Sequence, residues 1–242
     1  MTWYEEWFGT RYYKLLYGNR DIDDAQPWVR SILHKCGTAK GSAVLDMACG
    51  RGRHAYWFAQ EGMDVHGIDI SEASIAEART AVPDAHFDVH DMRHPYRSDT
   101  FDLAVCLFSS LGYSEHTEDD QRILATAADA LHNGGMFVLD LMNEARIRSE
   151  LVPEERLERG GAVFRIEREV KDGRIEKRIH VQEAGEEHHY LERVRLYPGE
   201  AIEAMAEKVG LEVIEWTDGP EMTPFDPERS FRAVLWAKRK HR

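Results

Sequence analysis

The sequence predicts an α/β protein with a doubly wound, mostly parallel, seven-stranded sheet of Rossmann-like type. Between residues 43 and 143, short apolar segments alternate with amphipathic ones, as strands alternate with crossover helices in a parallel sheet. The first apolar segment runs directly into a glycine-containing turn. Over residues 161–197 the pattern changes to alternating apolar and polar residues, which predicts a small antiparallel insertion before the last helix.

The predicted elements follow in order along the chain. Residues 1–35 have a helical pattern that is broken by a polar segment over 17–27. Ser71 is a plausible N-cap, and the Asp172-Gly173 and Gly185-Glu186 pairs predict hairpin turns. The strands of the large sheet are predicted over 43–48, 64–70, 85–91, 101–110 and 136–143, with helices over 53–62, 71–81 and 119–135. A helix over 198–210 and two closing strands complete the chain.

Composition restricts the possible functions. The formal net charge of -13 over 242 residues disfavours binding to nucleic acid or to an anionic membrane unless a local basic patch exists. No apolar run approaches the length of about 18 residues that a membrane span needs, and the amino-terminal segment lacks the pattern of a signal peptide. These features predict a cytoplasmic protein.

No metal site is expected from the cysteine and histidine pattern. The three cysteines contain no CxxC pair. His188 and His189 are adjacent on a predicted strand, so their side chains point to opposite faces, and His180 adds no recognisable ligand spacing.

The turn after the first strand suggests a ligand that carries a positive charge. Residues 50–55 match the dinucleotide pattern GxGxxA, which is weak evidence alone. Asp46 lies inside the strand end, four residues before Gly50, where its carboxylate would repel a pyrophosphate. An ammonium group there would instead gain a charge-assisted hydrogen bond. The helix after Gly52 can receive a small anion at its N-terminus.

Two further acids fit a nucleoside. Asp69 follows the second strand, 19 residues after Gly50, near the spacing of about 20 at which an acid binds ribose hydroxyls. Asp91 and Met92 follow the third strand, where the carboxylate can accept from an adenine amino group and the thioether can pack on the ring. S-adenosylmethionine combines an ammonium, a carboxylate, a ribose and an adenine.

The segments "LDMACGRGRHA", "VHGIDIS", "HDMR" and "FSSLGY" resemble the successive motifs of class I S-adenosylmethionine-dependent methyltransferases. The likeness is best over about 40–145 and is greatest to bacterial small-molecule N-methyltransferases, such as those that dimethylate deoxyamino sugars. The resemblance implies S-adenosyl-L-methionine as the cofactor. It implies the following cofactor-binding residues: Asp46, Ala48, Gly50 and Gly52 for the methionine part, Asp69 with Ile70 for the ribose, Asp91 and Met92 for adenine, and Phe108 near the sulfonium.

The resemblance also identifies candidates near the methyl group. In the family the amino-terminal region covers the site and a tyrosine there touches the cofactor, which points to Tyr13. Arg20 could bind the methionine carboxylate or could be a solvated surface arginine. The amino-sugar enzymes have a histidine after "SSxG" near the acceptor, whereas this sequence has Tyr113. Tyr113 and Tyr13 are therefore the candidate catalytic residues for accepting or relaying a proton.

The predicted function is in-line methyl transfer to a small-molecule acceptor, through an amine nitrogen or a hydroxyl oxygen. A nicotinamide-dependent oxidoreductase and a non-catalytic S-adenosylmethionine-binding module remain as alternatives. The chain divides into a helical lid over 1–35, a cofactor-binding core over 36–150, an insertion over 151–197 that covers the acceptor site, and a carboxyl-terminal part over 198–242. The oligomeric state stays open.

Overall fold

A computed structural model describes residues 2–18 and 22–241. Its large sheet has seven strands in the order β10-β11-β5-β4-β1-β2-β3, which confirms the predicted Rossmann-like class. The strands from β3 to β5 are parallel, whereas β11 runs antiparallel to β5 and β10 antiparallel to β11. The strand bounds are β1 (Ala43–Met47), β2 (Asp64–Asp69), β3 (His86–Val89), β4 (Phe101–Cys106), β5 (Leu131–Met142), β10 (Leu211–Thr217) and β11 (Arg232–Arg239).

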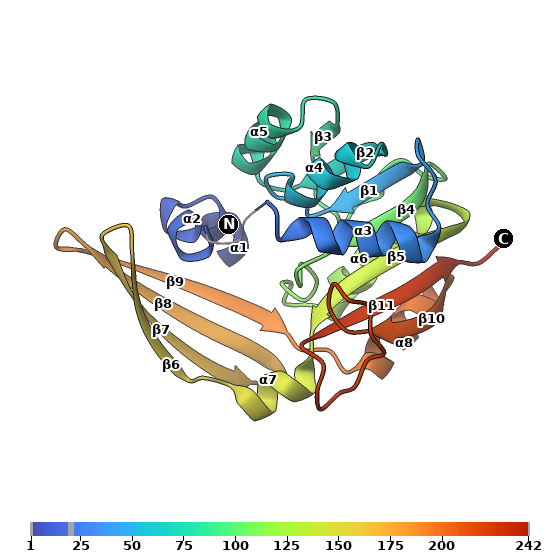
Figure 1. Cartoon of the computed structure of the whole chain (residues 1–242). Coiled ribbons are helices and arrows are strands. Elements are labelled where there is room, and N and C mark those ends of the chain that lie inside the picture. The colour runs from blue at the N-terminus through green and yellow to red at the C-terminus, as the bar shows by residue number, and fades with distance from the viewer. Residues whose placement is uncertain (1, 19–21, 242) are drawn as a thin grey trace.

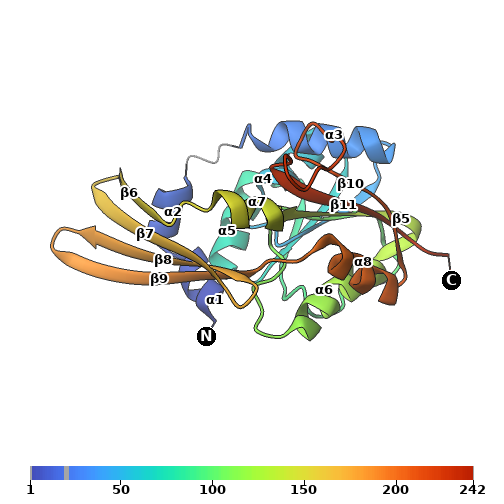
Figure 2. The same cartoon turned by 90° about the horizontal axis from the view of Figure 1, so that it is seen from below.

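Helices cover both faces of this sheet, because its central strands are apolar on both sides. One face packs against α3 (Ala25–Cys36), α4 (Arg53–Gln60) and α5 (Glu72–Ala81), and the other against α6 (Thr117–Ala130) and α8 (Gly199–Lys208). Figure 2 shows α3 on one side of the sheet and α6 and α8 on the other. Ser71 caps α5 as predicted, since its side chain accepts a hydrogen bond from the Ser74 amide.

The insertion forms a separate antiparallel sheet in the order β6-β7-β8-β9. Its strands are β6 (Glu154–Arg159), β7 (Ala162–Lys171), β8 (Arg174–Glu183) and β9 (Glu186–Arg195). The amino-terminal helices α1 (Trp3–Phe8) and α2 (Arg11–Tyr17) lie beside this sheet in Figure 1. Trp7 and Leu16 share an apolar cluster with β7 and β8. The Glu192 carboxylate of β9 accepts from the Trp7 indole at 2.7 Å and from the Tyr17 hydroxyl at 2.7 Å.

Several predicted boundaries were wrong. The strand predicted over 101–110 ends at Cys106, and the helix predicted over 119–135 ends at Ala130, after which the chain extends directly into β5. At the second hairpin, Ala184 and Gly185 have positive φ angles of 51° and 88°, so the turn lies one residue earlier than Gly185-Glu186. Two elements, β6 and α7 (Glu144–Glu150), were not predicted. β6 is mostly charged, and its pairing with β7 defines it as a strand.

The described residues contain no helix that is both long and apolar enough to cross a membrane. This agrees with the absence of a long apolar run in the sequence.

The close approach of β2 to β3 requires glycine at position 67. A Cβ atom there would lie 2.6 Å from the Phe87 ring and 2.9 Å from the Cys49 sulfur. We expect Gly67→Ala to lower the free energy of unfolding by about 1–3 kcal/mol, because the buried ring must move to admit the methyl group. Gly9→Ala is the matched control, since its added Cβ meets nothing within 4 Å. Denaturant unfolding measures both, and equal stability of the two variants would contradict the packing argument.

Candidate active site

The carboxyl ends of the parallel strands meet at one edge of the large sheet, and two connected cavities lie there. The first has a volume of about 560 Å³ and the second of about 1340 Å³, both including space open to solvent. Their linings share five residues, which therefore stand at the junction: Phe8, Ala48, Asp69, Ser110 and Tyr113. The residues predicted to bind adenine line the first cavity, and most of those predicted to bind the methionine part line the second.

The turn after β1 has the backbone that its glycines predict. Gly50 and Gly52 have φ angles of 56° and 79°, and Ala48 has a φ of 55°, where a side chain is disfavoured. A Cβ on Gly52 would lie 3.2 Å from Ala78 and 3.3 Å from Phe87, so this turn also packs closely on its neighbours. Gly50 lines the second cavity, whereas the buried Gly52 lines neither cavity and shapes the turn that enters α4.

Asp46 lies at the floor of the second cavity, and only 1% of its surface is exposed. Its Oδ2 atom has no hydrogen-bond partner in the described part of the chain. Burial raises the pKa of Asp46 to about 7, and the nearby Asp69 carboxylate adds to the rise, whereas Arg53 and the Ala55 amide oppose it. A cationic ligand would remove this penalty by ion pairing.

Asp69 has two roles in the structure. Its Oδ2 accepts from the Gly50 amide at 2.9 Å and its Oδ1 accepts from the Ser71 amide at 2.8 Å, so it fixes the glycine turn to the end of β2. It also lines both cavities. Burial raises the pKa of Asp69, although the two amide hydrogen bonds oppose the shift. Each carboxylate oxygen keeps a second lone pair that a ligand hydroxyl can use.

The predicted adenine-binding residues Asp91 and Met92 line the first cavity, as does Ile70, the neighbour of the predicted ribose-binding Asp69. The Asp91 carboxylate, however, is already engaged by the Arg93 guanidinium, with Nε 3.0 Å from Oδ1 and 2.9 Å from Oδ2. Burial alone would raise the pKa of Asp91, but the hydrogen bonds from Arg93 lower it. The sequence analysis did not include this ion pair, which fixes the Asp91 side chain in one orientation.

Phe108 lines the second cavity and begins a strained turn after β4. Phe108 and Ser109 have φ angles of 59° and 61°, which non-glycine residues rarely adopt. The buried Asp140 carboxylate accepts from the Phe108 amide at 2.7 Å, and the Asp140 carbonyl accepts from the Ser109 amide at 3.0 Å. Arg232 pairs with the same carboxylate at 2.7 Å and donates to the Ser109 hydroxyl at 2.6 Å.

Two residues of the second cavity were missed by the sequence analysis. The Arg53 guanidinium lies 4.2 Å from the centre of the Phe108 ring, and the His54 ring centre lies 5.2 Å from it. Burial, with help from Arg53, lowers the pKa of His54 to about 3, so the imidazole is neutral. Its Nε2 atom is without a hydrogen-bond partner among residues 2–18 and 22–241. Their position beside the glycine turn is the only sequence signal that could have identified them.

The two candidate catalytic tyrosines both line the second cavity, and Tyr113 also lines the first. Tyr113 packs against the amino-terminal helix, with its ring centre 5.1 Å from that of Trp3 and 5.6 Å from that of Phe8. Tyr13 packs on Phe8 at 5.0 Å. Arg20, the remaining candidate, lies outside the described residues.

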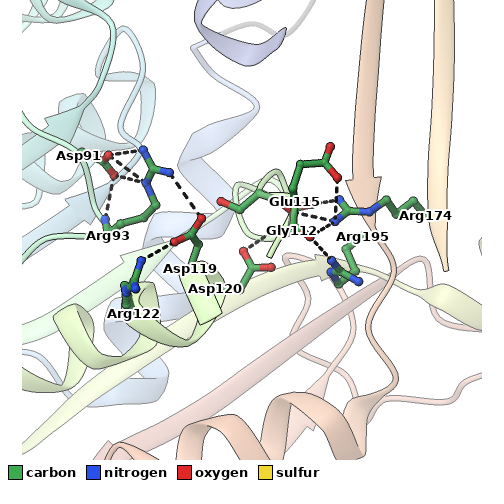
Figure 3. Close-up of polar contacts among 10 residues, drawn as sticks. Asp91, Arg93, Gly112, Glu115, Asp119, Asp120, Arg122, Arg174 and Arg195 are labelled. Carbon is green, nitrogen blue, oxygen red and sulfur yellow. Dashed lines mark hydrogen bonds and ion pairs between the residues drawn. The ribbon is translucent and has the colours of Figure 1, made fainter. Parts of the chain in front are cut away.

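The turn that carries Tyr113 is held on both sides, as Figure 3 shows. From the insertion, the buried Arg174 donates to the carbonyls of Ser114 and Glu115 at 2.8 and 2.9 Å. From α6, the Asp120 carboxylate accepts from the Gly112 amide at 3.0 Å. Gly112 has a φ of 95°, and an added Cβ would lie 2.9 Å from the Arg195 carbonyl. The insertion and α6 together therefore position the backbone on the two sides of Tyr113.

Comparisons with known proteins show the family to which the chain belongs. A family model described as a methyltransferase domain matches residues 44–135. The dTDP-3-amino-3,6-dideoxy-alpha-D-glucopyranose N,N-dimethyltransferase of Streptomyces fradiae is 30% identical over 191 residues, which cover 75% of this chain and 74% of that protein. The dTDP-3-amino-3,4,6-trideoxy-alpha-D-glucopyranose N,N-dimethyltransferase of Streptomyces venezuelae is 29% identical, covering 76% and 81%.

A solved structure shares the fold over almost the whole chain. The S-adenosylmethionine-dependent methyltransferase from Clostridium acetobutylicum superposes with a TM-score of 0.81 at 18% identity, covering 95% of this chain and 96% of that one. Together with the sheet order and the cavities at its carboxyl edge, these findings define a methyltransferase of the Rossmann-like type. The chain belongs to the class I S-adenosylmethionine-dependent methyltransferases, and it is an enzyme that uses S-adenosylmethionine. The comparisons support neither the oxidoreductase nor the non-catalytic module.

The residues present fit this cofactor. The unpartnered Oδ2 of Asp46 lies in the cavity beside the glycine turn, where it would complement an amino-acid ammonium. A pyrophosphate would meet an acid there instead, as the sequence analysis argued.

If Asp46 pairs with the cofactor ammonium, binding should depend on pH. Since its pKa in the free protein is about 7, acid protonates the carboxylate that must pair with the ammonium. We expect the affinity for S-adenosylmethionine to fall at least about tenfold from pH 7.5 to pH 5.5, while the cofactor ammonium stays charged. Isothermal titration calorimetry measures this change. Asp46→Asn should bind about tenfold or more weakly at pH 7.5 and lose most of the pH dependence; an unchanged pH profile would contradict the assignment.

Arg174 is expected to act as a positioning residue for Tyr113. Arg174→Ala removes the donors to the Ser114 and Glu115 carbonyls, and we expect kcat to fall about tenfold or more while cofactor affinity changes little. Arg174→Lys should recover part of the rate. Arg178→Ala, an exposed arginine on the same strand that pairs with Glu169 and Glu176, is the control. Steady-state kinetics on the folded variants measures the effect. A wild-type kcat for Arg174→Ala would contradict the positioning role.

Proposed function

We propose that this enzyme methylates an amine nitrogen of a small molecule, of the amino-sugar type, at the junction of the two cavities. The observation that carries the proposal is the set of residues that both linings share, with Tyr113 among them. A cofactor that extends from Asp46 to Met92 passes this junction with its central part. The methyl acceptor must therefore approach where Tyr113 and Phe8 form the wall.

The relatives support the amine in this proposal. Two of them are named as N,N-dimethyltransferases of dTDP-linked amino sugars. This chain differs from the amino-sugar pattern at Tyr113, so the acceptor contacts differ at that position. The net charge of -13 agrees with a small molecule rather than a nucleic acid as the partner. The free cysteines Cys36, Cys49 and Cys106 agree with the reducing conditions of the cytoplasm.

Bound S-adenosylmethionine supplies an electrophilic methyl group, so the protein must position the acceptor and exclude water. In the proposed site, the methionine part would be held by residues that line the second cavity, namely Asp46, Ala48, Gly50, Arg53, Phe108 and Tyr13, with Gly52 shaping the turn. Asp69 and Ile70 would hold the ribose, and Asp91 and Met92 would hold the adenine. An amine that arrives as an ammonium must lose a proton before it attacks, and the Tyr113 hydroxyl is the proposed acceptor or relay.

The division of the chain follows the same proposal. Within the predicted lid of residues 1–35, α1 and α2 would cover the core of residues 36–150, whereas α3 packs on the large sheet. The insertion over 151–197 would cover the acceptor. The contacts of Trp7 and Tyr17 with Glu192 support this arrangement, because they join the lid to the insertion. Residues 198–242 complete the sheet.

A panel of acceptors tests the proposed substrate class. With labelled cofactor, we expect transfer to amines of nucleotide-linked amino sugars and little transfer to matched phenols or carboxylic acids. Mass spectrometry of the product identifies the methylated atom. Transfer to oxygen alone would refute the amine proposal while leaving the methyltransferase assignment intact.

Tyr113→Phe tests the proton-transfer role. Removing the hydroxyl should lower kcat by about a hundredfold at neutral pH and leave cofactor affinity unchanged, with partial recovery at higher pH, where more amine is neutral. Tyr12→Phe is the control, since the Tyr12 hydroxyl donates to Glu183 at 3.1 Å and Tyr12 lines neither cavity. If the kcat of Tyr113→Phe equalled that of Tyr12→Phe, positioning of the acceptor alone would explain catalysis.

A further inference from the structure

The amino-terminal end of β2 carries a cluster that the active site does not use. Asp64 and His66 are two residues apart on this strand, so they share one face of the sheet. His86 of the edge strand β3 is the register partner of His66. The three side chains lie at the opposite end of β2 from Asp69. They are the one group of at least three histidine, cysteine or acidic side chains in the described chain whose ligand atoms converge.

The distances in this cluster suit a single metal ion. One ligand atom from each residue can be chosen so that all three lie within 4.8 Å of one another. His66 Nε2 lies 3.7 Å from Asp64 Oδ1, which is too far for a good hydrogen bond. Two ligands of one tetrahedral zinc ion, each about 2.0–2.1 Å from it, lie about 3.4 Å apart. Small rotations of the exposed Asp64 and His86 side chains would close the remaining gap.

His66 has the environment of a fixed ligand. Only 6% of its surface is exposed, and its Nδ1 atom lacks a hydrogen-bond partner within residues 2–18 and 22–241. The ring packs against Phe101 with 5.3 Å between ring centres, and it stacks on His86 at 4.7 Å. Packing therefore fixes the orientation of the ring, and the Nε2 atom, which faces Asp64, is the nitrogen available to a metal ion.

The donor set suits a divalent cation, although the surrounding charges are mixed. Among the charged neighbours of the His66 ring, Arg97 has the largest effect and opposes a positive charge, as does His86, whereas the Asp64 and Asp88 carboxylates favour one. The Asp88 carboxylate is held by the Tyr96 hydroxyl at 2.7 Å. Two imidazoles with a carboxylate form a donor set that suits Zn²⁺ or a similar divalent transition metal.

We propose that Asp64, His66 and His86 bind one divalent transition-metal ion of the zinc type, with solvent completing its coordination. Such an ion would tie the four-residue edge strand β3 to β2. β3 leads directly into residues 90–93, which line the first cavity. The bound ion would thus stabilise the segment that forms the proposed adenine wall, although it takes no part in methyl transfer. This proposal does not depend on the proposed acceptor.

Titration of the untagged, chelator-treated protein with Zn²⁺ tests the site. We expect one ion per chain in isothermal titration calorimetry, with micromolar or tighter affinity and a raised Tm. His86→Ala and Asp64→Asn should each weaken binding at least tenfold. Both side chains are exposed, so these variants keep the buried packing. Substitution with Co²⁺ should give the visible absorption of a low-symmetry, four-coordinate site, and His86→Ala should abolish it.

A second histidine pair provides the control. His180 and His189 of the insertion have their Nδ1 atoms 2.9 Å apart, but no third ligand of the described residues joins them. His189→Ala should leave the stoichiometry and affinity unchanged. The proposal is overturned if Zn²⁺ binds only at millimolar concentration, or if His189→Ala removes binding that His86→Ala leaves intact.

Discussion

Asp46 holds a carboxylate at the buried end of β1, where one oxygen has no hydrogen-bond partner in the described part of the protein. Beside it lies a second acid, Asp69, so the free site contains two neighbouring carboxylates that burial keeps from ionising easily. This arrangement is unfavourable without a ligand, and Arg53 offsets it only in part. An amino-acid nucleoside with an ammonium at one end and a ribose in the middle supplies what both acids lack. In the proposed site, these two acids would select the cofactor by pairing with its ammonium and its ribose hydroxyls.

The backbone near these two acids contains strained residues that other contacts hold in place. Ala48, Phe108 and Ser109 adopt positive φ angles at the ends of β1 and β4. Strain of this kind persists where surrounding contacts over-determine the conformation. At Phe108 and Ser109 the support comes from Asp140 and its ion pair with Arg232, which reach the turn from β5 and β11. The antiparallel end of the sheet therefore stabilises a turn that the parallel part presents to the ligand.

The sequence predicted those features that are encoded locally. The glycine turn, the Ser71 cap and the acid at the end of β2 follow from spacing within about 20 residues. Long-range contacts were not predictable. Arg174 is 60 residues from Ser114, and Arg232 is 92 residues from Asp140, and no periodic pattern links such pairs. β6 was missed for a related reason, because its charged residues form a strand only through pairing with β7. The Asp91–Arg93 pair depends on a loop conformation that spacing does not specify.

The helices α1 and α2 pack on the insertion, so these two segments form one structural unit although they lie far apart in the sequence. Trp7 and Leu16 bury their side chains against Phe164 and Ile179, and Glu192 links both helices to β9. A chimera that took the insertion from a relative but kept α1 and α2 would pair two surfaces that do not match each other. Recombination that replaces the insertion and keeps the large sheet should therefore exchange α1 and α2 with it.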